Sequence, residues 1–361
     1  MTFELLGIET TNRCNYTCTH CLRADIAPRK DLPQEVQSVI GPRNARRDIP
    51  LETIDKIIEQ ARPLHVKSVS LTGGEPTLHP EFAEIVGRFA KAGYTVNFLT
   101  NGTRWAKTFP IVERWRDSIG AVCFSIDGAT EATMDRLREP GAFRTTMGAI
   151  SVMRLRKLPF MMQLVICQDN LHELDQMAEL ACRVGAQIVS FCPVQPTLQT
   201  TYKRMNIPPK TWYAVKERIE RMRQIYKIKV EYMASMFPNE TSPWTSCNAL
   251  TMNAIYVDYL GNVTFCCQLS QYADSQVKTD IIANLEQDDL LEAVSKYTAQ
   301  VMEYHRIKRS KLEAGALSKV DRDFGCWYCF KHFSKVDFLR HFPDDPWAES
   351  VSEPRKLAIA G

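Results

Sequence analysis

Three cysteines stand close together near the amino end of the chain, at Cys14, Cys18 and Cys21. Thiolates select soft or borderline metals, chiefly zinc, copper(I) and iron–sulfur clusters. A closed structural zinc site needs four ligands, and these residues supply three. His20 is a possible fourth ligand, but it is the immediate neighbour of Cys21, which makes joint ligation of one ion sterically awkward. The spacing therefore predicts an iron–sulfur cluster in which one iron stays open to a ligand from outside.

The composition excludes several other classes of protein. The chain has 361 residues, 45% hydrophobic and 24% charged, which is ordinary for a globular protein with a sizeable core. A formal charge of +3 is too mild for nucleic-acid binding, and we interpret the basic stretches 23–50 and 306–322 as solvated surface. The sequence shows no export signal and no run of about 18 apolar residues, so we expect a cytoplasmic protein without a membrane partner. Twelve cysteines in such a chain favour metal or redox chemistry over disulfides.

Short apolar runs alternate with longer amphipathic segments from residue 3 to about residue 193. The strand-like runs are 3–9, 66–72, 94–100, 120–127, 160–167 and 186–194, and helical candidates include 50–64, 80–93, 143–157 and 171–185. Such alternation implies parallel strands joined by helical crossovers, buried beneath helices as near-continuous apolar runs. We therefore expect an α/β fold, a partial (β/α)6 TIM-like barrel whose functional groups gather at the carboxyl edge of the sheet.

The rhythm changes after about residue 205. A basic helix (209–227) and a short strand (228–233) lead to a hairpin whose turn is carried by Gly261 and Asn262. We place a domain boundary near residue 235, which predicts a barrel domain at 1–235, a smaller cysteine-bearing domain at 236–342 and a C-terminal tail at 343–361. The charged, proline-rich stretch 24–50 has the length of a lid or binding segment, and disorder is the alternative.

The cysteine spacing and three further motifs together resemble a known family. The pattern C-x3-C-x2-C follows the first predicted strand, and GGEP (73–76), TNG (100–102) and SIDG (125–128) follow the next three strands in order. This arrangement resembles the radical S-adenosylmethionine (SAM) enzymes over about residues 3–195. The resemblance implies that the open iron of a [4Fe–4S] cluster is chelated by the amino and carboxylate groups of S-adenosyl-L-methionine. One electron then cleaves the sulfonium, and a 5'-deoxyadenosyl radical takes a hydrogen atom from a substrate.

The same resemblance assigns cofactor-binding roles to residues at the strand ends. The candidates are His20, Gly73, Gly74, Glu75, Asn101, Ser125, Asp127, Arg138, Val165 and Ile166. Two adjacent glycines let the backbone approach a ligand closely, and Glu75 offers an acceptor for the methionine ammonium. Ser125 and Asp127 are expected to hydrogen-bond ribose hydroxyls or the methionine end.

The remaining candidates carry alternatives. Arg138 is a possible carboxylate partner, although solvation on a helix surface is the preferred interpretation. His20 either packs on the adenine or packs without a ligand. The fifth strand lacks the glycines of the family's adenine-contacting motif, so Val165 and Ile166 are chosen by position alone.

A second cysteine set lies in the C-terminal part of the chain. The pieces C-x13-G-x4-C (Cys247, Gly261, Cys266) and C-x2-C (Cys326, Cys329) resemble the SPASM auxiliary-cluster domain or its shorter variant, twitch. A full SPASM domain binds two auxiliary clusters, whereas the five cysteines here suffice for one [4Fe–4S] cluster. The resemblance implies closure by Cys247, Cys266, Cys326 and Cys329, and a closed cluster suits electron transfer. A four-thiolate zinc site is the alternative.

The other cysteines receive different interpretations. Cys267 is left as a spare thiol that packs in the core, acts near the substrate or exchanges roles with Cys266, and it is the single candidate for a catalytic side chain. Cys123, Cys167, Cys182 and Cys192 lie in apolar segments and are interpreted as small buried hydrophobes.

An auxiliary cluster beside the substrate implies net two-electron oxidation. We expect dehydrogenation or crosslinking of a peptide or protein side chain, with a reductant such as flavodoxin or ferredoxin as a partner. The first alternative is a dehydrogenase of a small natural product such as an aminocyclitol. The first predicted strand starts at residue 3 and leaves no room for a leader-binding domain, which counts modestly against a leader-dependent peptide enzyme, although such a domain can be a separate protein. The second alternative is a non-catalytic iron–sulfur or zinc protein, against which the ordered motifs count.

Overall fold

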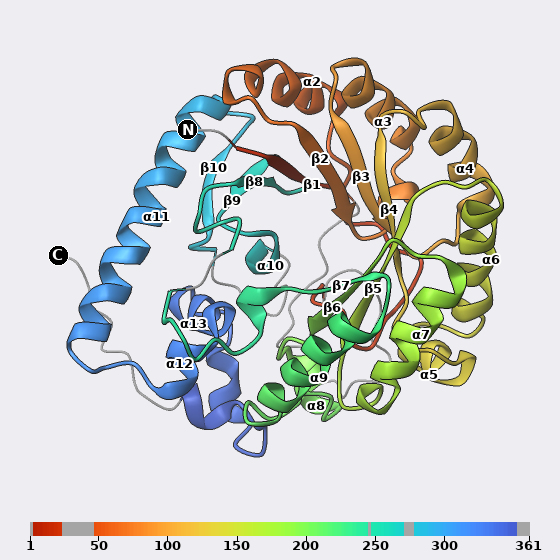
Figure 1. Ribbon diagram of the computed structural model, residues 1–361. Helices are drawn as coiled ribbons and strands as arrows, with labels where there is room; N and C mark the ends of the chain where they lie inside the picture. Colours follow the sequence, from red (N-terminus) through yellow and green to blue (C-terminus); the bar gives the residue numbers. More distant parts are fainter. Residues whose placement is uncertain (1–2, 24–46, 245–246, 271–277, 352–361) are drawn as a thin grey trace.

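One sheet runs through the whole of the computed structural model, which describes residues 3–23, 47–244, 247–270 and 278–351. Its strands lie in the order β10-β9-β8-β1-β2-β3-β4-β5-β6-β7 (Figure 1). Most of the predicted lid at 24–50 lies outside the described residues. Asp48, near its end, pairs with Thr11 in an isolated bridge at the end of the first strand.

The six predicted parallel strands are confirmed. They are β1 (Leu5–Thr11), β2 (Ser68–Gly73), β3 (Thr95–Thr100), β4 (Ile119–Ser125), β5 (Phe160–Ile166) and β6 (Ile188–Pro193), and β7 (Lys229–Tyr232) continues the parallel series. Strands β7 and β10 (Ile281–Asn284) are the two edges of the described sheet. The fold is therefore a mixed α/β structure with an open sheet, as expected for a partial barrel.

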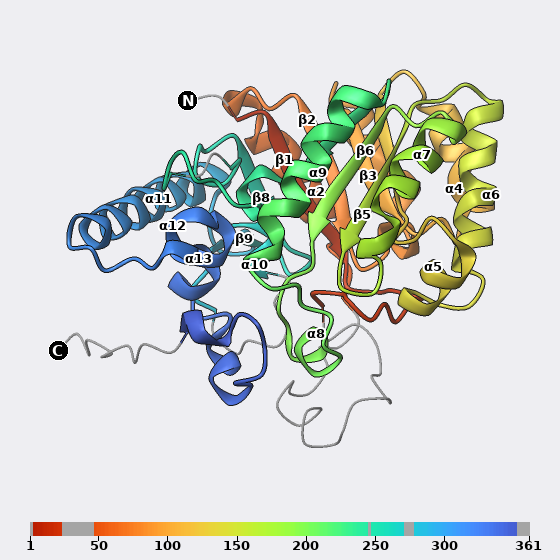
Figure 2. The same cartoon turned by 60° about the horizontal axis from the view of Figure 1, so that its bottom comes forward.

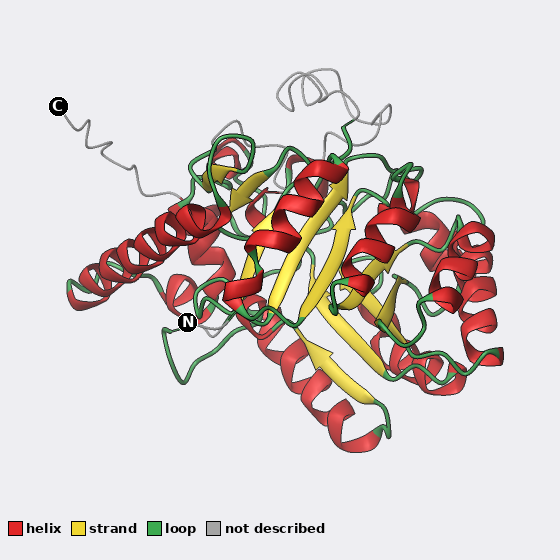
Figure 3. Cartoon of the chain, turned by 90° about the horizontal axis from the view of Figure 1, so that it is seen from above, coloured by secondary structure: helices red, strands yellow, loops and turns green. Residues whose placement is uncertain are grey.

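Helices cover the outer face of this sheet, as Figure 3 shows from above. They are α2 (Leu51–Gln60), α3 (Phe82–Lys91), α4 (Trp105–Arg114), α5 (Glu131–Leu137), α6 (Ala142–Leu155), α7 (Leu174–Val184) and α9 (Thr211–Ile225), whereas α8 (Leu198–Tyr202) lies beyond the ends of the strands (Figure 2). Short 3-10 helices occur at Arg62–Leu64, Pro76–Leu78, Leu171–Glu173, Ala234–Met236, Asp337–His341 and Ala348–Val351. The four predicted helices and the basic helix match α2, α3, α6, α7 and α9.

The inner face of the sheet differs from the expectation of continuous burial. Along β5, buried residues alternate with half-exposed ones. Phe98 and its neighbours on the outer face pack beneath helices, whereas Asn97, Gln163 and Ser190 on the other face are half-exposed and polar. Because the sheet does not close, its inner face is not filled by the packed side-chain layers of a closed barrel.

The C-terminal segment extends the same sheet. Strand β8 (Ala254–Val257) pairs in parallel with β1, and β9 (Asn262–Thr264) and β10 follow in antiparallel pairs. The predicted turn is present, with Gly261 at φ 76°. The remaining helices are α10 (Cys267–Ser270), α11 (Leu290–Glu313), α12 (Lys319–Asp323) and α13 (Gly325–His332). The sheet thus continues across the boundary predicted near residue 235, and Figure 2 shows α11 to α13 gathered beside the barrel helices.

The first part of the predicted C-terminal tail packs against the barrel. Trp347 is buried, and its ring lies 4.6 Å from that of Trp327 on α13. Its indole N–H donates to the carbonyl of Ile207 over 2.9 Å, and the Asn206 amide donates to Asp345 over 2.6 Å. Residues 343–351 therefore connect α13 to the segment between α8 and α9.

We expect Trp347→Ala to lower the free energy of unfolding by about 3–5 kcal/mol, because it removes a large buried ring and leaves a cavity. Trp347→Phe keeps most of the packing and loses the hydrogen bond to Ile207. We therefore expect it to lower the free energy of unfolding by about 1 kcal/mol. Urea denaturation of the two variants and the wild type measures both values. An unchanged midpoint for Trp347→Ala would show that residues 343–351 do not hold the C-terminal helices in place.

Candidate cofactor site and second cysteine site

The three N-terminal cysteines lie in an irregular loop that follows β1. The loop is anchored where the Thr17 N–H donates to Glu139 over 2.9 Å and the Thr19 N–H donates to the carbonyl of Leu137 over 2.9 Å. Burial raises the pKa of the Cys14 thiol to about 12, and burial raises the pKa of Cys18 further. The charges of the other two cysteines add to the rise at Cys18, so the three thiols face a common region. Metal binding there must release protons.

The described cysteines do not form a compact single-ion site. Among the residues that the structure describes, no group of three or more His, Cys, Asp or Glu side chains could hold one metal ion. A four-iron cluster takes one thiolate on each of several irons, so its ligands stand further apart than those of a single ion. All twelve cysteines lie in the described ranges and are free thiols.

The GGEP loop packs directly on the start of the cysteine loop. Gly73 has φ +132°, and a Cβ there would lie 2.3 Å from the carbonyl oxygen of Thr11. A Cβ at Gly74 would lie 2.1 Å from the carbonyl oxygen of Arg13, to which the Glu75 N–H donates over 2.7 Å. These glycines therefore let the GGEP loop approach the backbone of the cysteine loop, and the predicted approach of a ligand to them stays a prediction.

The Glu75 carboxylate is buried among donors from the protein. One oxygen accepts from the Thr77 and Thr100 hydroxyls over 2.6 and 2.8 Å, and the other accepts from the Asn101 N–H over 2.7 Å. Burial raises the pKa of Glu75 and outweighs these hydrogen bonds, which lower it. In the structure this carboxylate joins the second and third motifs, and its predicted contact with the methionine ammonium stays a prediction. The Asn101 amide then donates to Asn15 in the cysteine loop over 3.0 Å.

Asp127 is fully buried and both of its oxygens have protein partners. One accepts from the Val165 N–H over 2.8 Å, and the other contacts Arg138 and lies 3.0 Å from the His20 Nε2. Burial alone would raise the pKa of Asp127, but the charges of Arg138 and His20 outweigh it and hold the pKa well below its usual range. Asp127 is thus held by contacts within the protein, and its predicted contact with ribose hydroxyls or the methionine end stays a prediction.

Arg138 contradicts the preferred interpretation as a solvated helix residue. It caps the C-terminal end of α5, and its side chain is 9% exposed. Besides Asp127, its Nη1 donates to the Cys18 sulfur over 3.8 Å. The charged side chain at this helix end was expected to be solvated. The end of α5 instead lies against the cysteine loop, and the Arg138 guanidinium therefore points toward Cys18 and away from solvent.

The remaining candidates occupy different environments. Ser125 is half-buried at the end of β4, and Val165 is half-buried on β5. Ile166 belongs to the hydrophobic core, because alternate residues of β5 point to the helix-covered face, so its side chain is not placed for adenine contact. The Arg138 guanidinium donates to the Cys18 sulfur, and the His20 Nδ1 is buried without a partner among the described residues. Both features fit a site that a negatively charged thiolate cluster and its ligand would complete.

The structure brings together the four C-terminal cysteines that the sequence selects. Cys247 precedes β8, Cys266 follows β9, and Cys326 and Cys329 lie on α13. Burial raises the pKa of Cys329, and the charges of Cys247 and Cys266 raise it further. The hydroxyls of Ser235 and Tyr304 lie 3.4 Å from the Cys326 sulfur and 3.1 Å from the Cys329 sulfur, respectively.

Cys266 and Cys267 have distinct environments. A hydrogen bond with the Cys267 thiol lowers the pKa of Cys266 and, with burial, raises that of Cys267. The hydrogen bond therefore favours the deprotonated form of Cys266 over that of Cys267. Burial and the charge of Cys266 raise the pKa of Cys247 to about 11, whereas Cys267 adjoins Glu9.

A buried polar connection joins the two cysteine sites and was missed in the sequence. Arg23, two residues after Cys21, forms an ion pair with Glu9 on β1. The Ser270 hydroxyl at the end of α10 donates to the other oxygen of Glu9 over 3.0 Å. The guanidinium also lies 5.0 Å from the centre of the Tyr259 ring. The available signal was the charge of Glu9 directly after the apolar residues Leu5, Leu6 and Ile8 of the first predicted strand.

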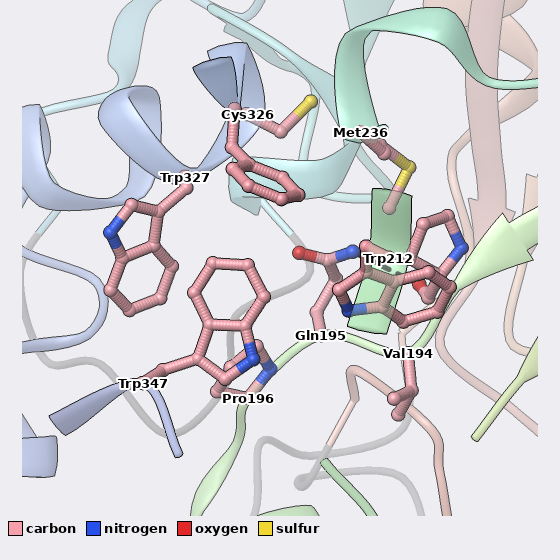
Figure 4. Close-up of a pocket in the computed structure, with 10 residues that line it drawn as sticks. Val194, Gln195, Pro196, Trp212, Met236, Cys326, Trp327 and Trp347 are labelled. Atoms are coloured by element: carbon pink, nitrogen blue, oxygen red, sulfur yellow. Dashed lines mark hydrogen bonds between the residues drawn. The ribbon is translucent and has the colours of Figure 1, made fainter. Parts of the chain in front are cut away.

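A small aromatic cavity of about 10 Å³ lies beside Cys326, enough for about one water molecule. Trp212, Trp327 and Trp347 surround it together with Gln195 (Figure 4). These side chains come from the end of β6, from α9 and from the C-terminal helices, so the cavity marks the packing between barrel and α13. Its size excludes a substrate. Among the described residues, no helix combines the length and apolar character needed to cross a bilayer.

Comparison with known proteins gives a domain assignment and a shared fold. Residues 8–181 match the family model of the radical SAM superfamily. The AdoMet-dependent heme synthase of Methanosarcina barkeri is 33% identical over 185 residues, covering 51% of this chain and 48% of that protein. The mycofactocin maturase MftC of Mycobacterium tuberculosis is 29% identical over 181 residues, covering 50% and 42%. The chain therefore spans about half the length of the curated relatives it matches.

A solved structure extends the likeness to most of the fold. Streptococcus suis SuiB bound to its precursor peptide SuiA has a TM-score of 0.62 and 14% sequence identity, covering 81% of this chain and 64% of that chain. At this identity the likeness concerns the fold, which includes the open parallel sheet.

Gly74→Ala is expected to disrupt the first cysteine site, because its Cβ would lie 2.1 Å from a backbone oxygen that supports the cysteine loop. If both cysteine sites hold a four-iron cluster, about eight irons are expected for the wild type after anaerobic reconstitution and about four for the variant. Gly148→Ala on α6 is the control, since a Cβ there meets no atom within 4 Å. That change should leave the iron content unaltered and stabilise the helix by about 0.5–1 kcal/mol. Equal iron in Gly74→Ala and wild type would contradict the role given to this contact.

Asp127→Asn should lower the free energy of unfolding by about 3–5 kcal/mol at neutral pH, because it leaves the buried Arg138 without its counter-charge. Since the pKa of Asp127 is lowered in the folded protein, its contribution is present above the unfolded carboxyl pKa of about 3.9 and is lost as the pH falls below it. Urea denaturation at several pH values should therefore show that the difference in the free energy of unfolding between wild type and variant becomes smaller as the pH falls from about 5.

Asp48→Asn serves as the matched control for this change. Asp48 pairs with Arg13, whose side chain is 36% exposed, so solvent screens the pair. We expect Asp48→Asn to lower the free energy of unfolding by about 1 kcal/mol or less. A gap for Asp127→Asn that stays constant with pH would show that the Asp127 charge does not stabilise the fold.

Proposed function

We propose that the radical SAM domain formed by residues 8–181 holds a [4Fe–4S] cluster and S-adenosyl-L-methionine, with which the protein oxidatively modifies a peptide. When bound, this pair supplies a 5'-deoxyadenosyl radical that takes a hydrogen atom from the substrate. The observation that carries the proposal is the convergence of Cys14, Cys18 and Cys21 at the end of β1, with the Arg138 guanidinium donating to the Cys18 sulfur. A positive charge next to a thiolate favours its deprotonated, ligating form.

The protein's own residues have supporting roles in this proposal. The three thiolates hold the metal centre, and Arg138 orients Cys18 while its own position is fixed by Asp127. The glycine loop and Glu75 hold the second and third motifs against the cysteine loop. His20 offers its buried Nδ1 toward the bound group. These groups are fixed by buried contacts before any ligand arrives, which is what precise placement of a reactive group requires.

We propose that Cys247, Cys266, Cys326 and Cys329 hold one auxiliary [4Fe–4S] cluster. Four thiolates close such a cluster and leave no iron open, which suits electron transfer. Cys267 donates a hydrogen bond to the Cys266 sulfur and thereby acts as a neighbour of the ligand, not as a ligand itself. Net removal of two electrons from the substrate would make the enzyme an oxidoreductase that forms a double bond or a crosslink.

A peptide substrate is supported by the names of the proteins that resemble this chain. MftC is a maturase, and the SuiB structure contains a precursor peptide. The heme synthase relative makes a small molecule the second candidate substrate. We further propose that flavodoxin or ferredoxin supplies the electron, and that the protein works in the cytoplasm, where its free thiols stay reduced.

Anaerobic reconstitution followed by S-adenosylmethionine and dithionite tests the proposal. We expect release of 5'-deoxyadenosine from the wild type and none from Cys18→Ala, which should also lose about four irons. Cys182→Ala on α7 is the matched control and should behave as the wild type. Addition of a substrate peptide should yield a product lacking two hydrogens by mass spectrometry.

Absence of 5'-deoxyadenosine from fully loaded wild-type protein would sink the radical SAM activity and favour a non-catalytic iron–sulfur protein. Four irons plus one zinc per chain would replace the auxiliary cluster with a zinc site. Conversion of a small molecule but of no peptide would favour the second candidate substrate.

A further inference from the structure

A cavity of about 170 Å³ opens on the outer side of the second cysteine site. Its walls come from the end of α11, from α13 and from the 3-10 segments that follow. Charged side chains dominate it, with Lys311, Lys331 and Arg340 against Asp321 and Asp337. The Arg340 side chain is 40% exposed, and Ala316, Leu317 and Val351 add apolar surface. A charged rim around an apolar patch is typical of surfaces that bind another protein transiently.

Aromatic side chains connect this cavity to the second cysteine site. Tyr328 and His332 line the cavity and flank Cys329 on α13. The Cys329 sulfur lies 3.1 Å from the Tyr304 hydroxyl. The Tyr304 ring lies 5.1 Å from that of His332 and 5.7 Å from that of Tyr328. The packed rings of Tyr304, Tyr328 and His332 therefore lie between the Cys329 sulfur, a predicted cluster ligand, and the space of the cavity.

The surface around the cavity is the most basic part of the described C-terminal region. Residues 306–322 contain six Lys and Arg against two Asp and Glu, an excess of four positive charges in a chain whose total is +3. Arg306 is 70% exposed and Arg309 is also exposed. Lys308 is the exception, since it is buried and donates to the carbonyl of Pro243. Exposed charges of one sign attract partners of the opposite sign and raise association rates.

We propose that this cavity and its basic surroundings are the docking site of an acidic one-electron carrier protein. The inference rests on the proposed function, because it requires a redox cluster on Cys329 and its neighbours. In the exchange, the reduced carrier loses one electron and the cluster gains one, and no atom or proton is transferred. The ring layer of Tyr304, Tyr328 and His332 keeps the distance short. Within the cavity Lys331 pairs with Asp321 and Arg340 with Asp337, so the charge of Lys311 and of the exposed basic residues around it orients the carrier.

Calorimetric titration of the reconstituted enzyme with oxidised ferredoxin and, separately, oxidised flavodoxin tests this proposal. We expect the wild type to bind at low ionic strength and to bind more weakly as salt is added. The double variant Lys311→Glu with Arg340→Glu should raise the dissociation constant about tenfold or more. It should also slow reduction of the enzyme by the reduced carrier in stopped-flow measurements.

The control reverses two exposed charges on the other side of the barrel. Arg154→Glu on α6 with Arg183→Glu on α7 changes the total charge by the same amount, far from α11 and α13 (Figure 1). It should raise the dissociation constant less than about threefold. The docking site would be overturned if both double variants raised the dissociation constant equally, or if the Lys311 and Arg340 variant left it unchanged. It would also be overturned if neither carrier bound to the wild type.

A separate measurement distinguishes this outcome from failure of the proposed function. Dithionite delivers electrons without docking, so the Lys311 and Arg340 variant should keep its iron content and its dithionite-driven release of 5'-deoxyadenosine. If the wild type itself releases none with dithionite, the proposed function fails, whatever the carriers do.

Discussion

A carboxylate removed from water must find opposite charge and hydrogen-bond donors inside the protein. Asp127 finds them in the cysteine loop, at the end of α5 and on β5, through His20, Arg138 and the Val165 N–H. Each of these segments is thereby fixed relative to the carboxyl edge of the sheet. A shift of the cysteine loop would remove His20 from this carboxylate, so the position of the loop is coupled to that of Asp127 and Arg138.

The second cysteine site depends on a strand pairing between distant parts of the chain. Strand β8 pairs in parallel with β1, so both end at the same edge of the sheet. The ion pair of Glu9 with Arg23, and the hydrogen bond from Ser270, then hold α10 against the first cysteine loop. The two cysteine sites are therefore parts of one polar arrangement on one sheet. Electron exchange between them would need no movement of separate bodies.

Several side-chain roles differ from those expected because a residue's surroundings depend on segments far away in the sequence. Arg138 has the local signature of a solvated helix residue, yet the cysteine loop covers it. The two glycines of the second motif have the signature of a ligand-binding turn, yet the backbone of Arg13 occupies the room they leave. Glu75 has the charge to bind an ammonium group, and in the structure it also accepts hydrogen bonds from the Thr100 hydroxyl and the Asn101 N–H at the end of the neighbouring strand. Neither spacing nor periodicity contains these contacts.

The sequence by itself determined the parallel strands, the helices that follow them, the order of the motifs and the choice of the cysteines. These features depend on local periodicity and on residue spacing along the chain, which folding does not alter. Only the tertiary structure decided that the inner face of the open sheet is polar, that the C-terminal hairpin joins β1, and which partners satisfy Asp127, Glu75 and Glu9. Those outcomes are decided by which distant segments meet when apolar faces are buried, because each buried polar group must then be satisfied by whatever donor or charge the packing brings to it.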